Sequence, residues 1–114
     1  MATIEQAVRG ARTQSIFRDV NERVRRINEA FSVVVPLGEW VCECADQDCA
    51  VRITMTHAEY EAIRVNPTRF LVAVGDEHVL PEIEDVVERN EHYWVVEKLG
   101  EAAKLATSVD PRQA

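Results

Sequence analysis

The three cysteines of this chain, Cys42, Cys44 and Cys49, all lie within eight consecutive residues. Thiolate ligands favour zinc, which takes four cysteine or histidine ligands in a tetrahedron. With zinc–sulfur bonds of about 2.3 Å, two sulfur ligands lie roughly 3.8 Å apart. The small, polar residues 45–48 can turn the chain so that Cys49 approaches the other two thiols. The spacing therefore predicts that one short loop supplies three zinc ligands.

A zinc site with three cysteines needs a fourth ligand from elsewhere in the chain. We expect His78 in this role, because it follows a glycine in a loop from which its side chain can reach the cysteines. The residues that could take its place are, in order of preference, His57 and His92, and then Asp46, Asp48 or a water molecule. The predicted centre is therefore a Cys3His zinc site, with two other histidines as alternatives.

Two other roles of the cysteines are alternatives to zinc binding. Buried cysteines often act as small hydrophobic residues, but the neighbours of these cysteines are polar: Glu43, Asp46, Gln47 and Asp48. Three cysteines and a histidine also hold the two-iron cluster of CDGSH-type proteins, which begin with the same CxC spacing. Their third cysteine is further away and carries an Asp-Gly-Ser-His run that this chain lacks. Zinc is therefore the favoured cofactor, and an iron–sulfur cluster is the alternative.

Size and composition indicate one small globular domain. The chain has 114 residues, of which 46% are hydrophobic and 29% are charged. A domain of this length buries a modest core, which a metal cross-link commonly supplements. No run approaches the ~20 apolar residues of a membrane span, and the N-terminal part carries arginines and no hydrophobic signal core. We therefore expect a cytoplasmic protein, in which thiols stay reduced.

Charge is unevenly distributed along the chain. Residues 1–31 contain six arginines and four acidic residues, whereas residues 32–114 contain seven cations and sixteen acids. The first part therefore has a net charge of +2 and the second part has one of −9. Phosphates are attracted to a positive field, so an acidic body disfavours non-specific binding of nucleic acids. We expect a protein partner or a second copy of this chain, and neither a nucleic acid nor a membrane.

The clearest element of secondary structure is a helix over residues 15–31. Apolar residues recur there at steps of three and four, which predicts a stripe made of Ile16, Phe17, Val20, Val24, Ile27 and Phe31. Residues 1–14 either extend this helix or fray. Opposite charges four residues apart are expected to pair on its wet side, in Asp19–Arg23 and Glu22–Arg26. A stripe of this kind normally covers the protein's own core, and the alternative is that it binds a partner or a second copy.

The remaining pattern predicts strands joined by turns and short helices. Alternating apolar residues and turn signals indicate strands over residues 40–44, 51–55, 70–74, 86–87 and 93–96. The last two are expected to form a hairpin, although residues 81–90 could instead form a short helix. Thr56 and Glu59 match a capping box, which begins a helix, and a final helix is expected over 99–106.

The predicted fold class is α+β. An N-terminal amphipathic helix packs on a small, mostly antiparallel sheet with one or two further short helices, and the metal site staples the fold. The chain divides into three predicted parts, a helical segment of residues 1–31, a metal-stapled core of residues 32–106 and a flexible tail of residues 107–114.

Several segments resemble a family of small, uncharacterised bacterial proteins typical of high-GC genomes. The resemblance covers roughly residues 16–98 and its most specific part is the CxCx4C cluster; the matching segments are 17–23, 41–44 with Cys49, 60–64, Pro67, Phe70, the region of His78, and 93–98. In these relatives a histidine follows the glycine closely, whereas Asp76 and Glu77 intervene here. The family has no established activity, so the resemblance implies a metal site and no particular reaction.

The function that we expect is that of a non-enzymatic interaction or regulatory module with a structural zinc site. The sequence has no glycine-rich phosphate loop, no GxSxG and no HExxH. One alternative is a zinc-ribbon-like protein that binds nucleic acid through Arg18, Arg23, Arg25 and Arg26. Another is a zinc hydrolase with water as the fourth ligand and His57 or Glu59 as general base, although catalytic zinc usually prefers histidine-rich ligand sets. Oxidation of the clustered thiolates, with release of zinc, is a minor further alternative.

Overall fold

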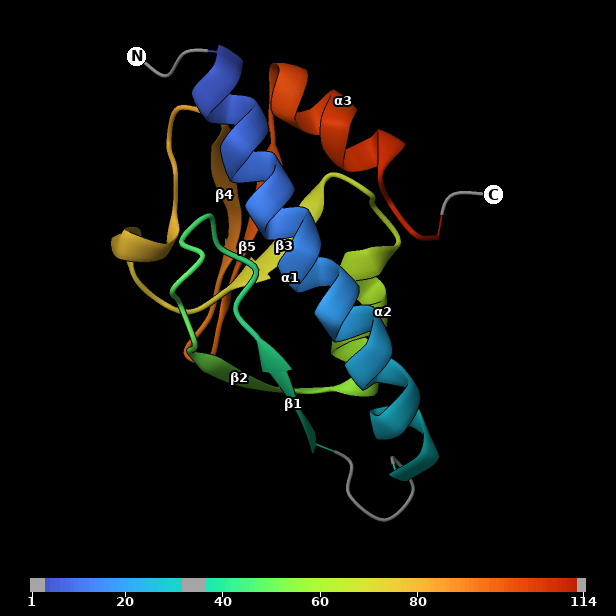
Figure 1. Ribbon diagram of the computed structural model, residues 1–114. Helices are drawn as coiled ribbons and strands as arrows, with labels where there is room; N and C mark the ends of the chain where they lie inside the picture. The colour runs from blue at the N-terminus through green and yellow to red at the C-terminus, as the bar shows by residue number, and fades with distance from the viewer. Residues whose placement is uncertain (1–3, 32–36, 113–114) are drawn as a thin grey trace.

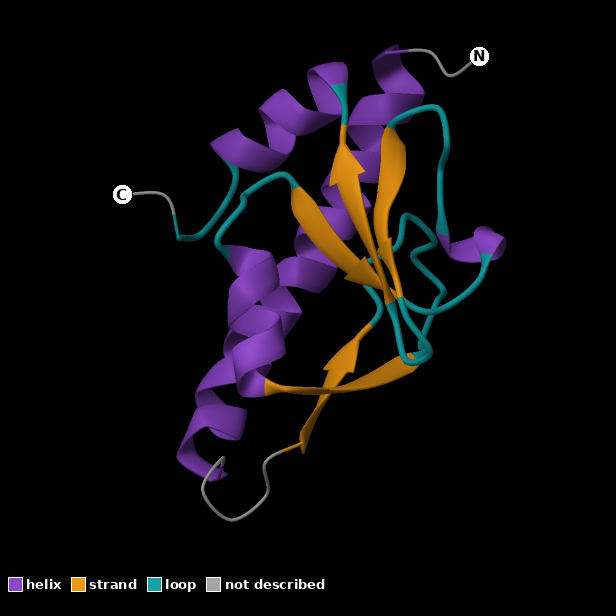
Figure 2. Cartoon of the chain, turned by 180° about the vertical axis from the view of Figure 1, so that it is seen from behind, coloured by secondary structure: helices purple, strands orange, loops and turns teal. Residues whose placement is uncertain are grey.

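A long first helix lies along one side of the molecule and two small antiparallel sheets lie on the other (Figures 1 and 2). The computed structural model describes residues 4–31 and 37–112. In chain order the elements are α1 (Ile4–Phe31), β1 (Leu37–Val41), β2 (Arg52–Thr56), α2 (His57–Arg64), β3 (Arg69–Val72), the 3-10 turn η1 (Asp76–His78), β4 (Glu84–Arg89), β5 (Trp94–Lys98) and α3 (Gly100–Ser108). The predicted α+β class is confirmed. Among the described helices, none combines the length and the apolar composition that a membrane crossing requires.

The strands form two separate sheets. β1 pairs with β2, and the second sheet has the order β3-β5-β4, with antiparallel neighbours throughout. The predicted hairpin of β4 and β5 is therefore confirmed, and residues 84–89 are a strand and not a helix. β1 ends at Val41, so the prediction of a strand over residues 40–44 is wrong beyond that point. The backbone changes its hydrogen-bond partner at this point. The Cys42 amide still donates to the Val51 carbonyl, just before β2 (3.0 Å), whereas the Glu43 amide donates to the Leu71 carbonyl of β3 (2.8 Å).

The short helices begin and end where local chemistry dictates. Thr56 and Glu59 form the predicted capping box, in which each side chain accepts a hydrogen bond from the other residue's backbone amide (3.0 Å each). Tyr60 of α2 is buried and its ring stacks on Trp40 of β1, with ring centres 4.0 Å apart. This stack joins the smaller sheet to α2 at the centre of the core.

The end of the chain is held against the core up to Arg112. α3 continues to Ser108, and the Asp110 carboxylate then accepts a hydrogen bond of 2.5 Å from the buried Arg64 guanidinium. Arg112 pairs with Glu22 (2.5 Å) and with Glu61 (2.8 Å). The predicted tail from residue 107 is therefore anchored through residue 112 by ion pairs that the sequence pattern did not indicate, and residues 113–114 lie outside the described part.

The apolar stripe predicted for α1 does not face the core as expected. The buried residues of the helix are instead mostly polar: Gly10, Ala11, Gln14, Ser15, Arg18 and Asn21. Val24, at one edge of the stripe, packs on the core, but Ile16 and Ile27 are 63% and 61% exposed. The side chain of Phe31 lies outside the described part. Among the described residues, the two predicted ion pairs Asp19–Arg23 and Glu22–Arg26 do not form. Glu22 instead turns towards three other arginines, Arg25, Arg64 and Arg112.

Hydrogen bonds explain why α1 buries its polar face. The Arg18 guanidinium donates to the carbonyl oxygens of Pro67 (2.6 Å) and Ala106 (2.7 Å) and lies over the Phe70 ring at 4.3 Å. Gln14 donates to Glu84 (2.9 Å), and the buried Lys98 ammonium donates to both of them. Buried polar groups are tolerated when they are paired in this way. The helix is therefore docked by specific polar contacts, and its more apolar side is left outward.

Candidate metal centre

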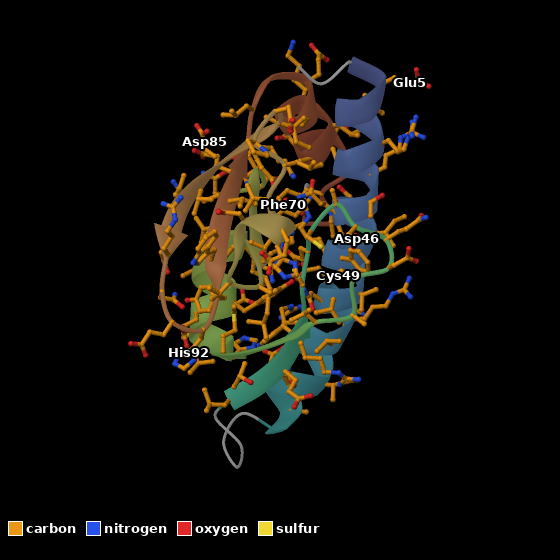
Figure 3. All side chains as sticks on the ribbon, turned by 90° about the vertical axis from the view of Figure 1, so that its left-hand side faces the viewer. Glu5, Asp46, Cys49, Phe70, Asp85 and His92 are labelled. Carbon is orange, nitrogen blue, oxygen red and sulfur yellow. The ribbon has the colours of Figure 1, made fainter. Side chains whose placement is uncertain are left out.

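Three cysteines and one histidine converge beside α1. The ligand atoms of Cys42, Cys44, Cys49 and His78 all lie within 4.8 Å of one another. The cysteines come from the loop between β1 and β2, and the histidine comes from η1, after β3. Figure 3 shows Cys49 and Asp46 in this loop, which runs along α1. The chain therefore brings two distant segments to one point, and the group could hold a metal ion.

The distances within the cluster match those of ligands that share one ion. The Nδ1 atom of His78 is 3.7 Å from the sulfur of Cys42 and 3.8 Å from that of Cys49. A tetrahedral zinc site with bonds of about 2.0 Å to nitrogen and 2.3 Å to sulfur places such atoms roughly 3.5 Å apart. Cys42 and Cys44 are almost fully buried and Cys49 is half-buried. The donors therefore have the separation, the type and the partial shielding of a group that could hold one metal ion.

A short turn places Cys49 opposite the other two cysteines. The Asp46 carboxylate accepts a hydrogen bond from the Asp48 amide (2.9 Å), and the Asp46 carbonyl accepts one from the Cys49 amide (3.0 Å). Aspartate commonly stabilises turns by accepting a hydrogen bond from the backbone two residues further on. The polar residues between the cysteines therefore shape the loop, and the Asp46 carboxylate is engaged in that turn.

Glu43 fixes the loop from inside the protein. Its side chain is fully buried between Cys42 and Cys44, where it accepts hydrogen bonds from the Asn21 side chain (2.8 Å) and from the Leu71 amide (3.1 Å). Burial raises the pKa of this carboxyl to about 7, although both hydrogen bonds act in the opposite direction. α1 and β3 therefore hold the residue that separates two of the three thiols.

A glycine and a glutamate lie beside His78 in the turn that carries it. Gly75 has φ +131°, a conformation that residues with a side chain rarely adopt. The carboxylate of Glu77 folds back over this glycine, so that a Cβ atom at Gly75 would lie 2.5 Å from its oxygens. The same carboxylate lies 3.7 Å from Nε2 of His78. Metal-bound histidines usually direct the second ring nitrogen towards a carboxylate, and Glu77 occupies that side of the His78 ring, beyond hydrogen-bond distance.

The thiols interact with one another and with the backbone. The hydrogen bond from Cys42 lowers the pKa of the Cys44 thiol to about 5, and the same interaction raises the pKa of Cys42. Burial raises the pKa of Cys49. The Ala73 amide donates a hydrogen bond of 3.2 Å to the Cys42 sulfur. Cys44 is therefore the thiol that ionises most readily, and a bound cation would favour ionisation of the other two.

The other candidate ligands lie away from the cluster. His57 begins α2 and lies 3.7 Å from the Glu61 carboxylate. His92 is exposed at the end of the β4–β5 hairpin, far from Cys49 in Figure 3. The Asp48 side chain is exposed, and neither it nor Asp46 belongs to the group of converging donors among the described residues. The structure thus brings His78, and neither of the other histidines, to the cysteines.

Sequence reasoning did not identify Glu43 or Glu77 as parts of this site. Both were visible only as acidic residues next to candidate ligands, a position that surface residues also occupy. The burial of Glu43 depends on Asn21, which is 22 residues away, and the position of Glu77 depends on the turn at Gly75. Their roles therefore become visible only in three dimensions.

Comparison of the chain with family models, curated proteins and solved structures finds no match. The resemblance to small bacterial proteins therefore stays a prediction.

Proposed function

We propose that this protein is a small zinc-binding module in which a structural Cys3His site, made of Cys42, Cys44, Cys49 and His78, closes the fold, and that the module acts through interaction and not through catalysis. The observation that supports the metal site is the convergence of four donor atoms within 4.8 Å from segments 29 residues apart at their nearest. A zinc ion there would cross-link the β1–β2 loop to η1, and such sites contribute directly to folding free energy.

The make-up of the site favours a structural role over hydrolysis. Four protein donors close a tetrahedral shell, whereas catalytic zinc keeps one position for water. The two residues considered as general bases are used elsewhere. His57 faces Glu61, and Glu59 accepts hydrogen bonds from the Thr56 amide and from the Tyr93 hydroxyl (2.8 Å). We therefore do not favour a zinc hydrolase.

The arginines of α1 give little support to nucleic-acid binding. Arg18 is fully buried, and Arg25 lies 3.2 Å from Glu29 and within 3.9 Å of two further carboxylates. Of the four arginines considered, Arg23 and Arg26 remain exposed, on a chain with a net charge of −7. Phosphate binding needs a larger positive field. A protein partner is therefore the better proposal.

A single ion fits the site better than an iron–sulfur cluster. In a tetrahedral zinc site two sulfur ligands lie roughly 3.8 Å apart. All four donor atoms lie within 4.8 Å of one another, and Nδ1 of His78 lies 3.7 Å and 3.8 Å from two of the sulfurs. Ligands on different irons of a cluster are separated further by the distance between the irons.

We also propose that the protein works in the cytoplasm, because cysteine thiols stay reduced there.

Elemental analysis of the natively purified protein tests this proposal. We expect one zinc ion per chain, a colourless solution, and loss of the metal in Cys49→Ser and His78→Ala. The matched control is His57→Ala, which changes a histidine outside the cluster and should keep the metal. A brown protein that contains iron and labile sulfide would show that the cofactor is an iron–sulfur cluster and not zinc. A metal-free native protein that is equally stable with and without a chelator would overturn the proposal.

A further inference from the structure

The outward face of α1 carries an apolar row that the rest of the described molecule does not cover. Ile16 is 63% exposed, Val20 36% and Ile27 61%. Their spacing of four and seven residues places them on one side of the helix. The docked side, centred on Arg18 and Asn21, lies opposite, and in Figure 1 the helix runs along the outside of the molecule. Exposed apolar residues that share one face can contribute to an interaction surface, whereas single scattered ones are common on any protein.

Charged residues complete this face and give it a pattern. Arg23 occupies the helical position between Val20 and Ile27, and Asp19 and Arg26 lie along one edge of the row. All three are exposed, and in the described part of the chain their side chains make no hydrogen bond or ion pair. The face therefore presents an apolar row together with unpaired charges of both signs.

We infer that the occupant of this face is a second copy of the same chain, with the two α1 helices packed antiparallel about a twofold axis near residues 21 and 22. In this arrangement Ile16 of one copy faces Ile27 of the other, and Val20 faces the aliphatic stem of Arg23, whose head stays in water. The interface is isologous, because each contact occurs twice.

Charge complementarity selects a second copy in this orientation. With this axis, Asp19 of one copy lies level with residue 24 of the other. It is therefore displaced along the helix by about 1.5 Å from Arg23 and about 3 Å from Arg26 of the second copy. Each Asp19 can thus pair with an arginine across the interface. A parallel pair would instead place Asp19, Arg23 and Arg26 each level with the same residue of the other copy, which like-charge repulsion disfavours. In the antiparallel pair the two Arg23 residues lie about 4.5 Å apart along the axis, and each lies nearer to an Asp19 of the other copy.

This inference names the partner of the interaction role proposed above, and it can fail independently of the metal site. The face and the cysteine cluster are formed by different residues, so that every variant below retains Cys42, Cys44, Cys49 and His78. Metal content measured on the same samples distinguishes failure of self-association from failure of the zinc site.

Sedimentation equilibrium of the metal-containing protein over a range of concentrations is the test. We expect a monomer–dimer equilibrium that Ile16→Glu and Ile27→Glu each weaken at least about 10-fold, because each would bury a charge in place of an isoleucine. Val65→Glu is the matched control, since Val65 is 83% exposed and lies directly after α2, outside α1. It should leave self-association unchanged.

Charge reversal separates the antiparallel pair from non-specific adhesion. Asp19→Arg and Arg26→Asp should each weaken the dimer, and the double variant should recover most of the affinity because it restores opposite charges across the axis. A strictly monomeric wild type would overturn the inference. A dimer that is insensitive to Ile16→Glu, or that the double charge variant does not restore, would also overturn it. A monomer that instead binds an unrelated protein through this face would replace the second copy with that partner.

Discussion

The Asn21 side chain on α1 donates a hydrogen bond of 2.8 Å to the carboxylate of Glu43, which lies between two of the clustered cysteines. The same amide group also donates to the Val41 carbonyl (2.8 Å), and its oxygen accepts from the Val41 amide (2.8 Å). One side chain on the helix therefore holds both the end of β1 and the start of the cysteine loop. This contact links the docking of α1 to the geometry of the candidate metal centre.

Replacing Asn21 should destabilise the fold and disturb the metal site. Asn21→Ala leaves buried polar groups of Val41 and Glu43 unpaired, so that we expect a loss of about 1–3 kcal/mol in the free energy of unfolding. Urea denaturation of the zinc-loaded protein measures it. The control is Asn28→Ala in the same helix, because the side-chain nitrogen of Asn28 has no hydrogen-bond partner among the described residues. Equal effects of the two substitutions would contradict the role of Asn21.

His78→Ala should weaken zinc binding more than any other histidine substitution. Loss of a residue that only orients a ligand costs 10–100-fold in metal affinity, so that loss of the ligand itself should cost more than about 100-fold. Competition with a chromophoric zinc chelator measures the affinity. His57→Ala and His92→Ala should stay within a few-fold of the wild type, as neither residue belongs to the cluster. A comparable loss in either control would reassign the fourth ligand.

Glu77→Gln should lower zinc affinity without removing a ligand. The Glu77 carboxylate lies 3.7 Å from Nε2 of His78, and an amide orients the imidazole less strongly than a carboxylate does. We expect a loss of about 10-fold, at the lower end of the range for residues that support metal ligands. Asp76→Asn is the control, because Asp76 is an exposed acid in the same turn. An unchanged affinity in Glu77→Gln would show that the carboxylate does not act on His78.

The pairing of Asp110 with Arg64 should make stability depend on pH in acid. Burial alone would raise the pKa of Asp110, but the hydrogen bond and the charge of Arg64 outweigh it and hold the pKa below the ordinary 3.8. A lowered pKa stabilises the folded state above about pH 3.8, and this contribution is lost as the pH falls through the folded-state value. Asp110→Asn should therefore cost about 3 kcal/mol at pH 7.

The difference between wild type and Asp110→Asn should shrink as the pH is lowered below about 4. Urea unfolding at a series of pH values measures this difference. Both proteins keep the cysteine cluster, so any loss of metal in acid affects both equally and does not change the difference. Asp85→Asn, an exposed residue of β4, should have little effect at any pH. A constant difference between pH 7 and pH 3 would argue against the ion pair.

Local patterns were sufficient for some elements and misleading for others. The capping box of Thr56 and Glu59 and the hairpin of β4 and β5 follow from interactions between near neighbours, and both were predicted. The facing of α1 was predicted wrongly, because the periodicity of Ile16 and Ile27 says that a stripe exists and not which surface it meets. The partners that bury Arg18, such as Pro67 and Ala106, lie 49 and 88 residues away and leave no local signal.

The sequence alone determined the α+β class and the three clustered thiols, since both depend on residue types at short spacing. The tertiary structure decided which histidine approaches those thiols, because the turn at Gly75 and the position of β3 bring His78 within 3.8 Å of Cys49. It also decided that α1 docks through Gln14, Arg18 and Asn21. The physical reason is that a buried polar side chain is stable only beside its hydrogen-bond partners, and the chain supplies those partners from distant segments.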